Sequence, residues 1–529
     1  MEHDQVVDQA AYERRWAILG VLCLSLFMVI IGNTVLNLAL PTLVRELHAT
    51  NTQLQWIVDA YSLVFAGFLF TGGALGDRFG RKGLLQIGLA LFGAGSALST
   101  LATSANHLIA TRALMGLAGA LVMPATLSIL ANVFPPQERG RAIGVWAGVA
   151  GAGAAIGPIA SGVLLEHFYW GSIFFVNVPV VVTALVLGYL IVPTSRDPAR
   201  TPLDPVGALI SIGALGSLLF AIIEAPRRGW TEAGTVAAFI LALVLIALFV
   251  YWELHTDHPM LNLHFFQHPG FTGGAIAITL VFFTMFGSFF LLTQYLQLVK
   301  GYTPLGAGVR TLPMAMTMMV AAPSAARLVE RFGSRRVVTM GLAIVAFGMA
   351  VFSRAGVDTN YWYIAAALVV LAIGMANTMA PSTGAIMTSL PMAKAGVGSA
   401  VNDTTRELGG SLGVAVIGSL MASRYTAAIH HRAGSLPKAV LNVADHSLGA
   451  ALGVARSLGG VRGAELASAA RSAFVDATHV ALLVGAAVAA FGAFLIFRIL
   501  PADLGRLESI EVVEEEPGDI LAPVAASAG

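Results

Sequence analysis

Apolar residues run through this chain in long stretches, separated by short polar breaks rich in Pro, Gly and charged residues. An α-helix needs about 20 apolar residues to cross the core of a bilayer. Fourteen stretches of roughly that length lie at 17–40, 56–76, 83–102, 108–131, 142–165, 173–193, 204–224, 233–252, 272–295, 307–328, 337–354, 361–389, 399–423 and 477–498. The pattern therefore predicts an all-α polytopic membrane protein with 14 transmembrane helices.

Composition agrees with this pattern. The 529 residues are 57% hydrophobic and 11% charged, whereas soluble domains carry about 25% charged residues. A soluble enzyme, a nucleic-acid-binding protein and a disordered protein are thereby disfavoured. The net charge of +1 implies no strongly charged partner, and the single Cys23 excludes an internal disulfide framework and a Cys-based zinc site.

Arg and Lys gather in alternate short loops, which predicts the orientation of the chain. With the N-terminus inside, the cytoplasmic loops hold more basic residues than the outer loops, so we expect both termini in the cytoplasm and the protein in the cytoplasmic (inner or plasma) membrane. The first apolar stretch is longer than a signal-peptide core and is followed by further spans, so we interpret it as a retained helix.

An internal repeat divides the chain. The stretch Gly76-Asp77-Arg78-Phe79-Gly80-Arg81-Lys82 recurs as Val329-Glu330-Arg331-Phe332-Gly333-Ser334-Arg335, each between two spans. Chance similarity of two basic loops is the alternative. Repeats of this kind build many transporters, with the substrate site between the halves. The predicted parts are a cytoplasmic N-terminus 1–16, a six-helix bundle 17–193, two inserted helices with their loop 194–271, a second six-helix bundle 272–498 with a long outer loop 424–476, and an acidic cytoplasmic tail 499–529.

The segment Gly73-Ala-Leu-Gly-Asp77-Arg78-Phe-Gly80-Arg81-Lys82 closely resembles the signature loop of the major facilitator superfamily. Its glycines allow tight turns and close helix approach. Asp77 is placed to cap the next helix or to pair with Arg, while Arg78, Arg81 and Lys82 fix the topology. We expect Gly73, Asp77, Arg78, Gly80, Arg81 and Lys82 to act in gating. A plain positive-inside loop is the alternative.

Arg112 lies inside the fourth span, where a charge is expensive and usually functional. In the superfamily the pattern of this Arg with Gly116 is associated with proton coupling. The alternative is an Arg that extends from a helix end to the surface.

Small residues follow one face of the fifth span, at Gly153, Gly157, Pro158 and Gly162. The segment resembles the antiporter motif of the superfamily, which indicates export rather than uptake. Small residues four apart let helix backbones touch, and Pro158 bends the helix. We expect this face at the interface that opens and closes between the halves; a generic packing face is the alternative.

Three further stretches are similar to the 14-span drug:proton antiporters of the EmrB/QacA type: Thr34–Pro41, Gln55–Tyr61 and Asn402–Gly410. The resemblance covers nearly the whole chain and implies the major facilitator fold, two six-helix bundles plus two inserted central helices. Many relatives carry an Asp just before the first stretch, where this chain has Gly32 and Asn33. This departure leaves open both the ion site and the charge of the substrate.

Proton coupling requires a group that changes protonation and is reachable from both sides in turn. The leading carriers are Asp59, Asp403 and Glu407; the last two share a helix face beside Arg406, and Arg112 completes the predicted set. The alternative for Asp59 is an outer helix cap or a water-facing residue, and that for the second group is a helix-end salt-bridge cluster. For Glu224, followed by two Arg residues, we expect a surface ion pair.

Polar and aromatic residues of several spans are candidates for the substrate cavity, by stacking on an apolar drug: Asn33, Asn37, Trp56, Tyr61, Phe286 and Phe290. Packing against lipid or protein is the alternative for the aromatic ones. Four His between 255 and 268 show no regular ligand spacing, so we expect no metal site. Gly409-Gly410-Ser411-Leu412-Gly413 matches the hydrolase pattern Gly-x-Ser-x-Gly, but in an apolar helix it indicates helix packing.

We therefore expect no enzyme but a secondary active transporter that exports hydrophobic drugs or antibiotics in exchange for protons, with the proton gradient as energy source and no cofactor. Alternatives are a dedicated exporter of an endogenous lipid or secondary metabolite, and a non-transporting membrane protein. The partners are a small hydrophobic substrate, protons and the bilayer, with no nucleic acid. We expect a monomer; a periplasmic adaptor stays open.

Overall fold

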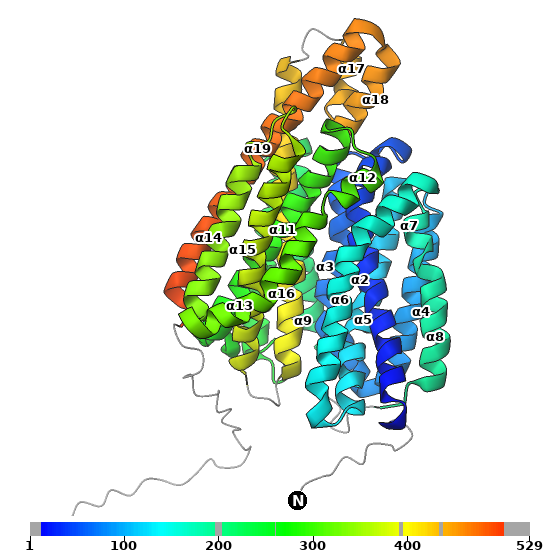
Figure 1. Ribbon diagram of the computed structural model, residues 1–529, viewed down its shortest axis with the longest axis vertical. Coiled ribbons are helices and arrows are strands. Elements are labelled where there is room, and N and C mark those ends of the chain that lie inside the picture. The colour runs from blue at the N-terminus through cyan, green and yellow to red at the C-terminus, as the bar shows by residue number, and fades with distance from the viewer. Residues whose placement is uncertain (1–11, 196–203, 260, 391–394, 433–436, 502–529) are drawn as a thin grey trace, which may run out of the picture.

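The computed structural model describes residues 12–195, 204–259, 261–390, 395–432 and 437–501, and within these ranges the chain is helical and has no strand. Long helices run side by side, and two short helices, α17 (Lys438–Ala444) and α18 (Leu448–Leu458), cover one end (Figure 1). We call this the cap end, and we call the end at which α2 begins the opposite end.

The first group of helices forms what we call the N-half. It comprises α2 (Arg15–Glu46), α3 (Asn51–Phe79), α4 (Arg81–Thr100), α5 (Ala105–Val133), α6 (Pro136–His167) and the pair α7 (Ser172–Phe175) and α8 (Asn177–Ile191). Two inserted helices follow, α9 (Pro205–Arg228) and α10 (Ala233–His255), and then the 3-10 helix η1 (Leu263–Gln267).

The second group forms the C-half. It comprises α11 (Pro269–Gln294) with the π-helix η2 (Tyr295–Val299), α12 (Pro304–Val309), α13 (Leu312–Phe332), α14 (Ser334–Phe352), α15 (Tyr361–Thr388), α16 (Ala395–Arg432) and α19 (Gly460–Ile499). The fold class predicted from the sequence is thereby confirmed: two helical halves with a helix pair inserted between them in the chain.

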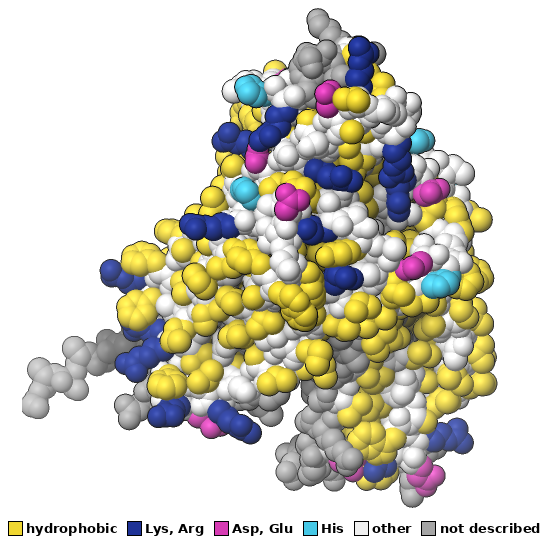
Figure 2. Space-filling view, turned by 45° about the horizontal axis from the view of Figure 1, so that its top comes forward, with side chains coloured by type: hydrophobic (Ala, Val, Ile, Leu, Met, Phe, Trp, Pro, Cys, Tyr) yellow, Lys and Arg dark blue, Asp and Glu magenta, His cyan; other side chains and the backbone are white. Residues whose placement is uncertain are grey.

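Each predicted span coincides with a long helix or, for the sixth and tenth spans, with a short helix and the longer one after it. In the described residues, twelve helices are long and apolar enough to cross a membrane. The helices α3 and α6 are not among these twelve, so the count of fourteen stays a prediction. On the face shown in Figure 2, hydrophobic side chains form a broad belt, with Lys, Arg, acidic and His side chains gathered toward the two ends.

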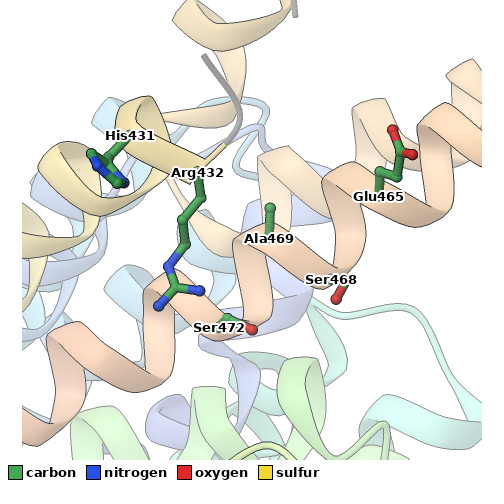
Figure 3. A pocket seen from close by; sticks show the side chains of 6 residues that line it. All are labelled: His431, Arg432, Glu465, Ser468, Ala469 and Ser472. Carbon is green, nitrogen blue, oxygen red and sulfur yellow. The ribbon is translucent and has the colours of Figure 1, made fainter. Parts of the chain in front are cut away.

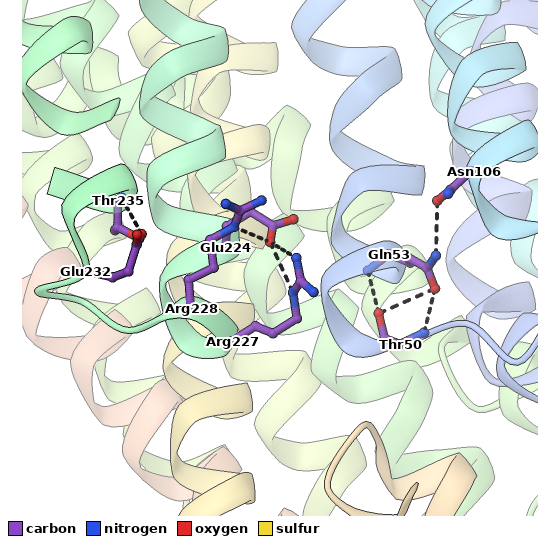
Figure 4. Close-up of polar contacts among 8 residues, drawn as sticks. All are labelled: Thr50, Gln53, Asn106, Glu224, Arg227, Arg228, Glu232 and Thr235. Carbon is purple, nitrogen blue, oxygen red and sulfur yellow. Dashed lines mark hydrogen bonds and ion pairs between the residues drawn. The ribbon is translucent and has the colours of Figure 1, made fainter. Parts of the chain in front are cut away.

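Polar side chains at helix starts accept hydrogen bonds from the backbone N–H groups that a helix leaves free in its first turn. Thr50 and Gln53 form a capping box at the start of α3, in which Gln53 N donates to Thr50 Oγ1 at 3.2 Å and Thr50 N donates to Gln53 Oε1 at 3.1 Å (Figure 4). Glu232 caps α10 and accepts from Thr235 N at 3.0 Å. The backbone N–H groups of Gly234 and Thr235 lower the pKa of the Glu232 carboxyl.

The repeat seen in the sequence is also present in the backbone. Gly80 joins α3 to α4 with φ +118°, and Gly333 joins α13 to α14 with φ +79°. Both values lie in the region that favours glycine. The N–H of Gly80 donates to Gly76 O at 2.9 Å, and that of Gly333 donates to Val329 O at 2.8 Å. Two turns of the same geometry therefore occupy corresponding places in the two halves.

The halves touch closely where α6 meets α12. A Cβ atom added to Gly162 would lie 2.6 Å from Cα of Leu305, and one added to Gly308 would lie 2.6 Å from the carbonyl oxygen of Pro158. Such distances mean that the two backbones are in direct contact, which only glycine permits. A second bridge joins η2 and α2, because Gln297 Nε2 donates to Leu38 O at 2.8 Å.

Most of the predicted long outer loop 424–476 is helical, and its position outside the membrane stays a prediction. α16 continues to Arg432, α17 and α18 follow, and α19 already begins at Gly460. The segment is only weakly apolar, since these helices bury one face, for example Leu448 and Leu452 of α18. The cap reaches the N-half, where Asn51 N donates to His446 O at 3.2 Å.

Candidate functional site

Arg112 lies in the second turn of α5 and is fully buried. Its Nε donates to Ile57 O at 3.2 Å and its Nη1 to Gly32 O at 3.1 Å. The alternative of a side chain that extends to the surface is therefore wrong. These bonds tie α5 to α3 and to α2 through a buried charge, the kind of group that a membrane protein retains for function.

The guanidinium of Arg112 also stacks on Tyr61, with Cζ 4.4 Å from the ring centroid. Close packing of α5 on α3 makes this possible, because a Cβ at Gly116 would lie 2.3 Å from Tyr61 O. The spacing of Arg112 and Gly116 thus has a local explanation: the glycine brings the helices together and the arginine fills the gap beside it.

Asp59 is completely buried in α3, and neither of its carboxylate oxygens has a hydrogen-bond partner among the described residues. Thr50 caps the helix, so the alternative of a helix cap at Asp59 is wrong. Gln55 lies one turn before Asp59, and Ser62 lies three residues after it, so these side chains share one face of α3. Buried polar groups are normally hydrogen-bonded, so a buried carboxyl group without a hydrogen-bond partner is the most unusual feature of this face.

That face of α3 packs against α16 of the other half. Gln55 Nε2 donates to Val414 O at 3.2 Å, to Ala415 O at 3.1 Å and to Ser419 Oγ at 3.1 Å. Toward the opposite end, the Ser62 side chain lies close to the Glu407 side chain. The polar face of α3 therefore joins the two halves, with Asp59 between these two contacts.

Antiparallel α3 and α16 place Ser411 at the level of Asp59. Gln55 contacts residues 414 to 419 and Ser62 contacts Glu407, so the register between them brings Asp59 opposite Ser411. Ser411 is buried, and its Oγ has no hydrogen-bond partner among the described residues. The interface thus holds several polar groups that hydrogen bonds do not satisfy.

Asp403, Arg406 and Glu407 lie on the same stretch of α16. Arg406 Nη1 is 3.6 Å from Asp403 Oδ1, so the predicted salt-bridge alternative holds for this pair. The Asp403 side chain is 17% exposed, whereas Glu407 Oε2 is buried without a hydrogen-bond partner. The two acids are therefore not equivalent: Asp403 is paired and partly accessible, and Glu407 faces the N-half.

The glycines around Ser411 pack α16 on α11. A Cβ at Gly409 would lie 2.2 Å from Thr279 O, and one at Gly413 would lie 2.1 Å from Phe283 O. The packing interpretation of the Gly-x-Ser-x-Gly match is thereby confirmed, since the segment is helical throughout. With both glycines against α11, Ser411 faces α3.

The signature loop is the turn between α3 and α4. Arg78 is exposed, Gly73 lies near Pro124, and Lys82 Nζ donates to Tyr189 O at 2.7 Å. Arg81 N donates to Ser195 O at 2.9 Å. The side chain of Asp77 lies outside the described residues, so its predicted role in gating stays a prediction.

The glycines of the predicted antiporter helix lie on the faces of α6 that meet other helices. A Cβ at Gly153 would lie 3.1 Å from Ile30 of α2, and Gly162 and Pro158 contact α12 as described above. Ser161 Oγ donates to Val35 O at 2.7 Å. Gly157 is buried on the same helix. The motif thus contributes directly to the contact between the halves.

The predicted cavity residues are spread over several environments. Trp56 packs with residues of α9 such as Leu219 and Ile222, and Phe290 is fully buried in the core. Phe286 lies 3.2 Å from the Cβ position of Gly410, on the α11–α16 contact. Asn37 is buried, and the side chain of Asn33 lies outside the described residues. Their roles in substrate binding stay predictions.

Two surface features at the cap end lie apart from the buried group. Glu224 Oε2 pairs with Arg227 at 2.8 Å and with Arg228 at 3.3 Å, which confirms the predicted ion pair, with exposed arginines and a largely buried carboxylate (Figure 4). An open pocket is lined by His431, Arg432, Glu465, Ser468, Ala469 and Ser472 of α16 and α19 (Figure 3). Its distance from Glu407 along α16 is about 36 Å at 1.5 Å per residue.

Sequence reasoning missed Gln55, Ser62 and Ser411 as members of the site. A signal was present on α3, where Gln55, Asp59 and Ser62 recur at the spacing of one helix face inside an apolar stretch. No comparable signal identified Ser411, because a single serine on an apolar helix usually bonds to its own backbone.

Comparison with known families decides what kind of protein carries this group. Residues 22–414 match the family described as Major Facilitator Superfamily. The chain belongs to the Major Facilitator Superfamily. It is therefore a multi-pass membrane transporter with the family's helical fold, and the resemblance noted in the sequence is confirmed.

Curated relatives cover almost the full length. The "Multidrug efflux pump LfrA" of Mycolicibacterium smegmatis is 39% identical over 90% of this chain and 96% of its own. The "Methyl viologen resistance protein SmvA" of Salmonella typhimurium is 36% identical over 89% of this chain and 95% of its own. The "Tetracenomycin C resistance and export protein" of Streptomyces glaucescens is 33% identical over 90% of each chain.

Solved structures of other transporters share the fold. A bacterial homolog of the human lysosomal transporter Spinster, in an inward-facing and occupied conformation, matches 92% of this chain and 97% of its own with a TM-score of 0.65 and 18% identity. The xylose transporter XylE from E. coli, in an inward open conformation, matches 93% of this chain and 98% of its own with a TM-score of 0.56 and 15% identity.

Proposed function

We propose that this transporter exports small hydrophobic compounds, such as drugs or antibiotics, in exchange for protons. Relatives that match about nine tenths of the chain are named for multidrug efflux, methyl viologen resistance and tetracenomycin C export. The differing compounds in these names favour a broad range of small substrates over a single one.

The observation that carries the proton-coupled part is Asp59. A buried carboxylate without a hydrogen-bond partner is costly, whereas the neutral acid is tolerated. We infer that Asp59 holds a proton while α3 and α16 are in contact. Separation of these helices would expose Asp59 to water and favour the charged form, so the protonation state follows the conformation.

The proposed cycle uses the two ends of the interface in turn. With the cap end open, substrate leaves and Asp59 takes up a proton. Protonation removes the charge and allows α3 to pack on α16 again. With the cap end closed, the proton passes toward the opposite end by way of Glu407 and Asp403, and new substrate enters. Arg112 holds α2, α3 and α5 together throughout.

The proposal also covers the membrane location, the oligomeric state and the energy source. We place the protein in the cytoplasmic membrane with the cap end outside and both termini in the cytoplasm, because the basic loop residues gather at the other face. A monomer suffices for this mechanism, since both halves of the site belong to one chain. The energy source is the proton gradient, without a cofactor and without an enzymatic step.

The test is drug accumulation in a host that lacks its own efflux pumps. Wild-type protein should lower the accumulation of at least some members of a panel of cationic, neutral and anionic fluorescent drugs. A protonophore should abolish the effect, and Asp59→Asn should behave like the empty vector. Gly20→Ala is the matched control, because no atom lies within 4 Å of the Cβ that it adds.

Unchanged accumulation of every compound, with the protein present in the membrane, would contradict drug export. Full activity of Asp59→Asn would show that the proton is carried elsewhere.

A further inference from the structure

Gln55 occupies the position directly above Asp59 on the side of the cap end. The two residues are one helix turn apart on the same face of α3, and Gln55 is 1% exposed. Every route along this face from the cap end to Asp59 therefore passes the Gln55 side chain.

The side-chain NH2 group of Gln55, with its two hydrogens, lies within hydrogen-bond distance of three acceptors in the other half. Nε2 donates to the backbone oxygens of Val414 and Ala415 and to Ser419 Oγ, at 3.1 to 3.2 Å. All three acceptors belong to α16, so these bonds exist only while the halves are together at this level.

The surface of α16 is shaped to receive this amide. A Cβ atom at Gly418 would lie 2.5 Å from Gln55 Nε2, so a larger residue at 418 would displace the side chain. Glycine at 418 therefore leaves the room that the Gln55 amide occupies. The fit joins two residues that are far apart in sequence and belong to different halves.

We propose that Gln55 is a gating residue that seals Asp59 from the cap end, and that breaking its contacts with α16 is the step that gives outside water access to this acid. The importance of the seal for transport rests on the proposed function, in which Asp59 carries the proton. The closure by Gln55 concerns only the access of water from the cap end, whatever the role of Asp59 in transport. It predicts that loss of Gln55 opens a route to the level of Asp59 and Ser411.

The experiment measures access by the reaction of a cysteine with a charged, membrane-impermeant thiol reagent on intact cells. The reporter is Ser411→Cys in a Cys23→Ser background, because Cys23 is the only cysteine in the chain. Gln55→Leu removes the amide, and Gly418→Ala displaces it without changing Gln55. Each should raise the reaction rate of the reporter by about tenfold or more, the factor that corresponds to roughly 1.4 kcal/mol.

The matched control is Gln53→Leu, on the same helix two residues earlier. Gln53 Nε2 donates to Asn106 Oδ1 at 3.0 Å, which is a contact within the N-half. Gln53→Leu should leave the reporter rate within about twofold of the parent. An equal rise in Gln53→Leu and Gln55→Leu, or no rise in Gln55→Leu and Gly418→Ala, would overturn the proposal.

Asp358→Cys verifies the side of the membrane, because Asp358 is exposed at the cap end. If it does not react on intact cells, the proposed orientation fails, and the same comparison is made on inverted vesicles, where the cap end faces the reagent.

A second arm separates the seal from proton transport. In liposomes without substrate, Gln55→Leu should increase the proton leak, and the additional Asp59→Asn should remove that increase. A faster reporter rate without a proton leak would support the seal and contradict the role of Asp59 as the proton carrier.

Discussion

The contact between Gly162 and Leu305 allows a quantitative test of how the halves separate. In Gly162→Ala the new Cβ would lie 2.6 Å from Leu305 Cα, 3.0 Å from Leu305 N and 3.1 Å from Pro304 O. All three are backbone atoms, so no flexible side chain can yield. α6 and α12 must move apart by roughly 1 Å to restore ordinary contact distances near 3.5–4.0 Å.

Overpacking of this kind costs about 1–3 kcal/mol. The cost arises only in the conformation in which α6 and α12 touch, whereas the gain in helix propensity on replacing Gly, about 1 kcal/mol, is present in both conformations. The equilibrium between closed and open cap ends should therefore shift toward the open form by about 5- to 150-fold.

Distance measurement between spin labels at Thr103 and Asp358 tests this shift. Both residues are exposed at the cap end, one in each half. Gly162→Ala should increase the population with the longer distance, and Gly20→Ala, which adds a Cβ in open space, should not. Identical distance distributions for Gly162→Ala and wild type would refute the reasoning that this contact closes the cap end.

Four further substitutions have defined outcomes. Asp59→Asn should fold and insert normally but lose substrate-driven proton movement in proteoliposomes; retained movement would exclude Asp59 as the carrier. Arg112→Ala should lower stability by about 3 kcal/mol or more, because a large buried side chain is removed, and a thermal melt within one degree of wild type would contradict this. Gly333→Ala should cost about 1–3 kcal/mol, because its φ of +79° is unfavourable for other residues, and the same melt measures it. For Glu232 the folded-state pKa is lowered, so its stabilising effect is complete above the ordinary Glu pKa and is lost as the pH falls through the lowered value. The difference in melting temperature between wild type and Glu232→Gln should therefore be present at pH 7 and shrink toward pH 3; a difference that grows on acidification would contradict the sign.

The sequence predicted the fold well because the bilayer imposes a simple pattern. Long apolar stretches located every long helix, and the repeated acid-Arg-Phe-Gly turn predicted two halves with corresponding turns at Gly80 and Gly333. The cap was missed because its helices are amphipathic, so that hydropathy alone did not distinguish them from a loop.

The candidate site was predicted only in part. Arg112 and Asp59 were identifiable because charge inside an apolar stretch is conspicuous in a sequence. Their surroundings were not, since the contacts that define the site connect α3 to α16, more than 350 positions apart for Gln55 and Val414. In the described residues both oxygens of Asp59 lack hydrogen-bond partners, whereas Gln55 on the same helix face pairs with α16. Such pairings depend on helix rotation and register, which hydropathy does not specify.

The central claim is that substrate is exchanged for protons by way of Asp59, and proton movement by the purified protein tests it most directly. The protein is placed in liposomes with an acidic interior, and the internal pH is followed while cationic, neutral and anionic drugs are added. The account predicts substrate-dependent proton release in the wild type that is lost in Asp59→Asn, with no change in Gly20→Ala. Proton release that persists in Asp59→Asn, or the absence of release for every drug with folded protein, would contradict it.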